Sequence, residues 1–117
     1  MHEIALVKNM FQMLEESFPG RIENIRTITL TAGLLSNVQP ILIQNAFDAV
    51  LKEEQRYKNV SLQVKILPIL IHCTDCDATT EIKHYTFVCS CGLPCNNIIQ
   101  GQELSVTEIE WNNIDLN

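Results

Sequence analysis

Basic residues are scarce in this chain of 117 residues: eight lysines and arginines stand against 14 aspartates and glutamates, which gives a formal net charge of −6. Proteins that bind nucleic-acid backbones carry a basic patch or stripe, so this balance argues against nucleic acid as a partner. Long apolar runs are also missing, because no stretch approaches the roughly 20 residues that a membrane-spanning helix needs. We therefore expect neither nucleic acid nor a membrane among the partners.

An export signal is missing as well, since the N-terminal stretch MHEIALVKN has no positively charged region that leads into a clean apolar run. We therefore expect a cytoplasmic protein, in which the five cysteines stay reduced and bind metal rather than form disulfides. The sequence also contains no phosphate-binding loop, no nucleophile–base pair and no paired carboxylates. These absences indicate that the protein is not an enzyme.

The apolar residues that are present predict an α+β fold. Helical spacing predicts a first helix that ends at the FPG stretch of residues 18–20, and a second helix that begins at Pro40. Alternation predicts strands within residues 26–33, 61–66 and 103–111. The residues expected to face inward are Ile4, Val7, Phe11, Leu14 and Phe18 in the first helix, Ile43, Phe47, Val50 and Leu51 in the second, and Ile28, Leu30, Ala32, Leu62, Val64 and Ile66 in the first two strands. The residues expected on the outer side of the first strand are Thr27, Thr29 and Thr31.

Two positions interrupt these patterns. Pro68 lies in the apolar tract that continues the second strand, and a proline there is suited to a sheet edge or a bulge. Ile109 falls out of phase with Leu104 and Val106, which a bulge near Glu108 would explain.

The predicted order is helix, strand, helix, strand, cysteine segment, strand. A chain of this length forms one compact domain, or one domain with a small appendage. We predict two helices packed on a small β-sheet, with an inserted zinc-ribbon-like four-cysteine module. In this division residues 1–70 and 100–117 form the α/β domain, and residues 71–99 form the cysteine module.

Cysteines provide the strongest local motif. Cys73 and Cys76 are spaced C-x2-C, a turn that lets two thiolates converge on one ion, and a second cysteine turn would complete a tetrahedral zinc site. Twelve residues separate Cys76 from Cys89, which is close to zinc-ribbon spacing. Four thiolates leave no open coordination position, so such a zinc is structural. Cys89, Cys91 and Cys95 compete for the two remaining ligand positions, and local spacing alone does not choose among them.

The N-terminal stretch MHE offers a second set of metal ligands. The free α-amine of Met1, the backbone nitrogen of His2 and its imidazole can form fused chelate rings around one ion. Nitrogen donors in a square-planar arrangement suit Ni(II) or Cu(II). Glu3 places a carboxylate at the helix start, where it partly offsets the repulsion between a bound cation and the positive end of the helix dipole. Taken alone, a histidine at this position is more often a solvated terminal residue.

Several segments of the sequence are more informative together than any of them is alone. They are the terminal MHE, the stretch TAGLLSNVQP, a helix ending in AFDAVL, the C-x2-C…C…CG cysteines and the strand IIQGQELSVTEIEW. In this order and at this spacing, they resemble the HypA/HybF family of hydrogenase-maturation nickel metallochaperones. The resemblance covers essentially the whole chain.

The resemblance implies a metallochaperone rather than an enzyme. It implies that Ni(II) is bound transiently through His2, with Met1 and Glu3 beside it, and is delivered for [NiFe] hydrogenase maturation and, in some organisms, for urease. It also implies a nickel-binding domain at residues 1–70 and 100–117 and a domain holding structural Zn(II) at residues 71–99. The implied partners are a hydrogenase-maturation GTPase, the [NiFe] hydrogenase large-subunit precursor and urease accessory proteins. The chain is expected to be a monomer or a homodimer.

The resemblance also bears on the zinc ligands, because Cys73, Cys76 and Cys89 match three of them. The family's second cysteine pair is usually C-P-x-C-G, with a G-x-EL segment ten residues after its last cysteine. Here Cys91 precedes Gly92 and Gly101 lies ten residues further on, so Cys91 matches the fourth ligand. Compared with the family pattern, one residue is then missing between Cys89 and Cys91, so the C-x-C turn is tighter than the usual C-P-x-C turn. Cys95 stays the alternative fourth ligand.

Two other interpretations use the cysteines alone. A zinc-ribbon protein-interaction or regulatory module needs no nickel and tolerates any N-terminal tag. A redox protein that uses Cys95 needs a thiol of lowered pKa, which the sequence does not reveal. His72 and His84 flank the cysteine segment and are expected to be surface or packing residues rather than ligands.

Overall fold

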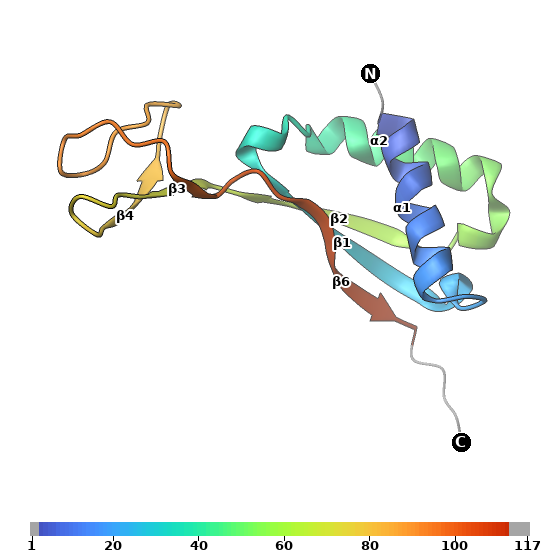
Figure 1. Cartoon of the computed structure of the whole chain (residues 1–117). Helices are drawn as coiled ribbons and strands as arrows, with labels where there is room; N and C mark the ends of the chain where they lie inside the picture. Colours follow the sequence, from blue (N-terminus) through green and yellow to red (C-terminus); the bar gives the residue numbers. More distant parts are fainter. Residues whose placement is uncertain (1–2, 113–117) are drawn as a thin grey trace. The chain divides into compact units, whose positions relative to one another are not determined.

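The computed structural model describes residues 3–112 of the chain (Figure 1). Its helices are α1 (Glu3–Ser17) and α2 (Pro40–Glu53), and three short 3-10 helices span Ile22–Asn24, Leu34–Ser36 and Gln55–Tyr57. One sheet has β1 (Ile25–Gly33) between β2 (Ser61–Leu67) and β6 (Leu104–Trp111), and the other has β3 (Ile69–His72) between β4 (Thr79–Ile82) and β5 (Ile98–Gln100). The predicted α+β fold is confirmed. Within residues 3–112, no helix is long and apolar enough to cross a membrane.

The chain divides into two compact units. The helix unit consists of the described parts of Met1–Leu30, Gln39–Val64 and Val106–Asn117, and the cysteine unit consists of Thr31–Val38 and Lys65–Ser105. The chain therefore passes between the units within strands β1, β2 and β6, and once more between Val38 and Gln39, just before α2. The cysteine unit is wider than residues 71–99, because it also takes one end of each of these strands. The assignment of nickel to one part and zinc to the other stays a prediction.

The helix unit has a core that both helices share. Figure 1 shows α1 and α2 on the same side of β1, β2 and β6. The ring of Phe11 stacks on Phe47, with centroids 5.7 Å apart, and on Tyr57, with centroids 4.1 Å apart. The buried residues of the helices are Val7, Met10, Phe11 and Leu14 in α1 and Ile43, Ala46, Phe47 and Val50 in α2. This helical spacing explains why the two faces could be predicted from the sequence.

The predicted burial of four residues is wrong. Ile4 is 46% exposed, because the buried face of α1 begins one turn later, at Val7. Ile66 is 37% exposed, since β2 is an edge strand and its end is covered less than a central strand. Thr29 and Thr31 are 9% and 5% exposed, although we expected them on an outward polar side. They lie in the middle strand of the sheet, between β2 and β6. Thr29 Oγ1 donates to Gln63 Oε1 of β2 at 3.4 Å.

Pro68 separates the two sheets, since β2 ends at Leu67 and β3 begins at Ile69. Proline has no N–H to donate, so a ladder of hydrogen bonds is interrupted there. The tract that we expected to extend or bend one strand therefore forms two strands in different sheets. In β6, Val106, Ile109 and Trp111 are half-buried, which is the change of phase that the sequence pattern indicated.

Two glycines allow backbone segments of the cysteine unit to cross. Gly33 N–H donates to the Glu103 carbonyl, and Leu35 N–H donates to the Gly101 carbonyl, both at 2.8 Å. A Cβ atom on Gly33 would lie 2.0 Å from the carbonyl carbon of Gly101, which no side chain can tolerate. Gly101 itself has φ +127°, a backbone conformation that favours glycine.

The cysteine unit has a small core beneath its metal-binding motif. Ile69, Ile71 and Ile82 are buried there, and the half-buried residues packed against them are Leu35, Phe87, Cys95 and Ile98. Strands β3 and β4 are antiparallel, with Ile69 opposite Ile82 and His72 opposite Thr79. Cys73 directly follows β3, so this sheet fixes the position of the first predicted zinc ligand.

Candidate metal centre

The first cysteine pair lies on a tight backbone turn. Cys73 N–H donates to the Ala78 carbonyl at 2.9 Å, and Asp77 N–H donates back to the Cys73 carbonyl at 2.8 Å. Asp77 has φ 61°, in the left-handed region that aspartate tolerates better than most residues. These bonds close the chain around Cys76, so that both sulfurs face one point.

The second cysteine pair lies on an even tighter turn. Cys89 N–H donates to the Leu93 carbonyl at 2.9 Å, and Gly92 N–H donates to the Cys89 carbonyl at 2.8 Å. The Cys91 N–H points to the sulfur of Cys89, with the nitrogen 3.4 Å from Sγ. Gly92 has φ 95°, a conformation that is costly for any residue with a Cβ atom. Glycine therefore accommodates the short C-x-C spacing.

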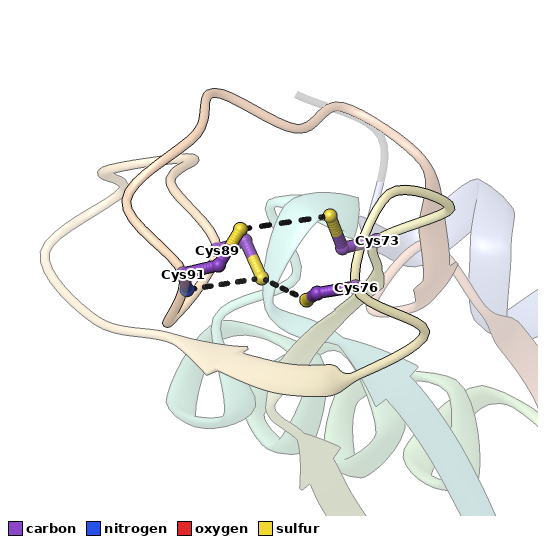
Figure 2. A group of neighbouring side chains, drawn as sticks. All are labelled: Cys73, Cys76, Cys89 and Cys91. Atoms are coloured by element: carbon purple, nitrogen blue, oxygen red, sulfur yellow. Dashed lines mark hydrogen bonds between the residues drawn. The ribbon is translucent and has the colours of Figure 1, made fainter.

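Four sulfur atoms meet between these turns. The Sγ atoms of Cys73, Cys76, Cys89 and Cys91 all lie within 4.8 Å of one another. Figure 2 shows the two pairs facing each other, with Cys76 and Cys89 Sγ 3.3 Å apart and Cys73 and Cys91 Sγ 3.9 Å apart. Zn–S bonds of about 2.3 Å in a tetrahedron place sulfurs about 3.8 Å apart. The donor set and its dimensions therefore fit a four-thiolate zinc ion.

Cys95 lies away from this group. Its sulfur donates to the His72 carbonyl at 3.3 Å, and its side chain packs against the small core that contains Ile69 and Ile71. A half-buried thiol in this setting behaves as a small apolar residue with one weak hydrogen bond. The structure thus brings Cys91, and not Cys95, to the other three cysteines.

The clustered thiols do not ionise alike. Hydrogen bonds lower the pKa of the Cys89 thiol to about 6, and the backbone N–H of Cys91 is the largest influence. The hydrogen bond with Cys89 is in turn the largest influence on Cys76, whose pKa is raised to about 12. Without a metal, Cys89 is therefore the first of this pair to lose its proton.

His72 links the first cysteine turn to the segment that follows the second turn, although it is not one of the four clustered residues. Its N–H donates to the Asn97 carbonyl at 3.0 Å, and its carbonyl accepts the Asn97 side-chain amide at 3.1 Å. Its ring nitrogens lie 2.9 Å from Asp77 Oδ1 and 3.3 Å from Thr79 Oγ1. Sequence reasoning did not identify this role, and the only available signal was the position of His72 next to Cys73. His84 is exposed.

Comparison with known proteins identifies the family. The model of a family described as "Hydrogenase/urease nickel incorporation, metallochaperone, hypA" matches residues 1–111. The chain belongs to the HypA family. The resemblance stated from the sequence is therefore confirmed, and with it the assignment to a metallochaperone family.

Relatives within the HypA family match nearly the whole chain. The hydrogenase maturation factor HypA of Moorella thermoacetica is 32% identical over 108 residues, which cover 91% of this chain and 95% of that protein. The hydrogenase maturation factor HypA of Campylobacter jejuni is 27% identical over 111 residues, which cover 93% and 97%.

Solved structures support the HypA fold. The solution structure of the Ni metallochaperone HypA from Helicobacter pylori matches with a TM-score of 0.63 at 22% identity, covering 96% of this chain and 98% of that chain. A second solution structure, of a HypA protein, matches with a TM-score of 0.57 at 19% identity, covering 92% and 89%. These likenesses concern the fold alone.

The predicted nickel ligands stand at the other end of the chain from the cysteines. Met1 and His2 lie outside the described residues, so their role stays a prediction. Glu3 is the first residue of α1 and is half-buried. A carboxylate in the first turn of a helix interacts favourably with the helix dipole.

Proposed function

We propose that this chain binds Ni(II) transiently at its N-terminus and delivers it for [NiFe] hydrogenase maturation, while a structural Zn(II) is held by four cysteines. The observation that carries the proposal is the family match over residues 1–111, because that range includes the terminal MHE as well as the cysteine segment. Neither motif alone is specific, since zinc modules and terminal histidines occur in many unrelated proteins.

The proposed zinc ligands are Cys73, Cys76, Cys89 and Cys91. Their sulfurs already lie within 4.8 Å of one another, and soft thiolates favour zinc over hard cations. Four protein ligands leave no position for a substrate or for water, so such a metal supplies stability rather than reactivity. The cysteine unit needs this support because only a few apolar residues form its core.

The proposed nickel ligands are the Met1 amine together with the backbone nitrogen and imidazole of His2, with Glu3 beside them. Nitrogen donors of this kind suit square-planar Ni(II). The positive end of α1 opposes a bound cation, and Glu3 offsets that effect only in part. We therefore expect moderate affinity, as a protein that must release its cargo requires.

The proposed partners follow from this role as a carrier. Nickel passes to the [NiFe] hydrogenase large-subunit precursor with the help of a hydrogenase-maturation GTPase, and urease accessory proteins are a second destination. In this role the chain carries a metal ion and catalyses no reaction, and we propose that it acts in the cytoplasm.

Calorimetric titration with Ni(II) tests the proposal on three zinc-loaded proteins: the native N-terminus, a short N-terminal extension and His2→Ala. We expect both changes to weaken nickel binding by more than about tenfold, because each removes a nitrogen donor or converts the free amine into an amide. Binding to the native protein should weaken as the pH falls through about 6.5, since the ligating imidazole must be neutral.

A matched control is His84→Ala, which removes an exposed histidine of the cysteine unit. It should leave nickel binding unchanged. Equal nickel affinity in all four proteins would contradict the proposal for the N-terminus and would leave a zinc-binding interaction module as the better explanation.

A further inference from the structure

The four clustered cysteines differ in their access to solvent. Cys73 and Cys89 are buried, whereas Cys76 and Cys91 are exposed. Each turn therefore contributes one buried and one exposed residue to the group. A small molecule in solution can approach the group from the side of Cys76 and Cys91, even when four ligands surround a metal.

The sulfur separations also differ. Cys76 and Cys89 Sγ are 3.3 Å apart, and Cys73 and Cys91 Sγ are 3.9 Å apart (Figure 2). Four cysteines can pair in three ways, and these two contacts belong to a single one of them, in which both bonds join the first turn to the second. A disulfide requires about 2.05 Å between sulfurs. The sulfurs of Cys76 and Cys89 therefore have to move less to form one than those of Cys73 and Cys91.

We propose that Cys76 and Cys89 form an oxidation site at which a hydroperoxide converts the two thiolates into a disulfide and releases the metal. This inference rests on the proposed zinc site and adds a chemical control over it. The exposed sulfur meets the oxidant, and the buried sulfur 3.3 Å away resolves the product.

The chemistry balances in two steps. In the zinc-loaded chain both sulfurs are thiolates, because a cysteine must be deprotonated to bind zinc. The exposed Cys76 thiolate attacks one peroxide oxygen, the O–O bond breaks, and a sulfenic acid and a hydroxide form. The Cys89 thiolate then attacks the Cys76 sulfur, the S–S bond forms, and the second hydroxide leaves. Two protons from solvent convert both hydroxides to water. The two thiolates have lost two electrons and the peroxide has gained them, so the metal keeps only two of its four ligands.

Cys95 takes no part in this step. Its sulfur is directed to the His72 carbonyl at 3.3 Å, and its side chain packs in the small core with Ile69, Ile71 and Ile82. A disulfide with Cys95 would require the loss of both interactions. Cys95→Ser is therefore a matched control, because a hydroxyl can keep the hydrogen bond and the four clustered cysteines stay intact.

The test treats the full, zinc-loaded chain with hydrogen peroxide. A chromophoric chelator follows free zinc, and mass spectrometry after thiol alkylation maps the disulfides. We expect zinc release to rise in step with a Cys76–Cys89 disulfide, in the wild-type chain and in Cys95→Ser alike, with Cys95 still alkylated in the wild type. Reduction followed by added zinc should restore the loaded protein.

Other outcomes overturn the inference. Zinc that stays bound with all thiols reduced would do so, as would a first disulfide within one turn or one that includes Cys95. The zinc content before treatment tests the proposed zinc site separately. A chain that holds no zinc before treatment would contradict the proposed zinc site, and with it the inference, before any oxidant is added.

Discussion

Cys91 and Cys95 are only four residues apart, yet their sulfur atoms have different surroundings. The Cys91 sulfur lies 3.9 Å from that of Cys73, within the group of four, whereas the Cys95 sulfur donates to the carbonyl of His72. A thiolate ligand must be free to face the ion, whereas the Cys95 sulfur faces a backbone carbonyl. The two residues should therefore respond differently to the same substitution.

We expect Cys91→Ser to lose zinc and Cys95→Ser to keep it in a one-to-one ratio. Loss of one thiolate ligand should lower zinc affinity by more than about 100-fold, the upper range seen when only an outer-shell partner of a metal ligand is removed. Metal analysis and competition with a chelator measure this on two proteins that differ by one atom each from the native chain. The reverse pattern would make Cys95 the fourth ligand.

At this scale the sequence could indicate part of the site. Cys73, Cys76 and Cys89 follow a local spacing that any zinc ribbon uses, so they could be named without a structure. The choice between Cys91 and Cys95 could not come from local spacing, and only the family resemblance favoured Cys91. The interaction that directs Cys95 elsewhere is with His72, which lies 23 positions earlier in the chain and is invisible to local reasoning.

Among the elements, the end of β1 and the segment just before β6 make a very close backbone approach. Gly33 has φ −74°, which any residue can adopt, so its requirement for glycine comes entirely from the 2.0 Å separation that a Cβ atom would have from Gly101. Gly20 is the opposite case, since it has φ +73° and an added Cβ atom would meet nothing within 4 Å. Substitution of Gly33 therefore tests steric overlap, and substitution of Gly20 tests backbone conformation.

Gly33→Ala should lower the free energy of unfolding of the cysteine unit by about 3 kcal/mol or more, the upper range for overpacking. The overlapping atom belongs to the backbone, so no change of rotamer can relieve the overlap. Amide hydrogen exchange measures this at residue 33 and Leu35, whose N–H groups donate to Glu103 and Gly101. Gly20→Ala should lower the free energy of unfolding by only about 1–2 kcal/mol and should leave those two amides protected from exchange. Unchanged protection of both amides in Gly33→Ala would contradict this account.

The elements that the sequence predicts well are those with a repeating pattern. Both helices follow a period that buries one face, and Pro40 begins α2 as a proline in a first turn should. The second sheet escaped prediction, because β3, β4 and β5 have only four, four and three residues. Strands this short show too few alternations to be recognised, and their pairing depends on contacts between distant parts of the chain.

In the molecule as a whole, the two units differ in what holds them together. The helix unit has a continuous aromatic and aliphatic core, in which Phe11 stacks on both Phe47 and Tyr57. The cysteine unit has three buried isoleucines in its core and long loops around the four cysteines. A core this small contributes little stability, so the proposed zinc must contribute to the folding of its unit directly.

Removal of zinc should therefore unfold the cysteine unit and leave the helix unit folded. The single tryptophan reports on the helix unit alone, because Trp111 packs edge-to-face on Phe18 at 5.3 Å and lies under the Arg21 guanidinium at 4.5 Å. With a strong chelator, we expect Trp111 fluorescence and the helical circular dichroism to change little, while the amides of β3 and β4 lose their protection from exchange by more than about 100-fold. Cys73→Ser should give the same result without a chelator, which separates loss of zinc from side effects of the reagent. Simultaneous loss of the Trp111 signal and the helical signal would show that the two units fold as one, because the metal would then support the core around Phe11 as well as its own loops.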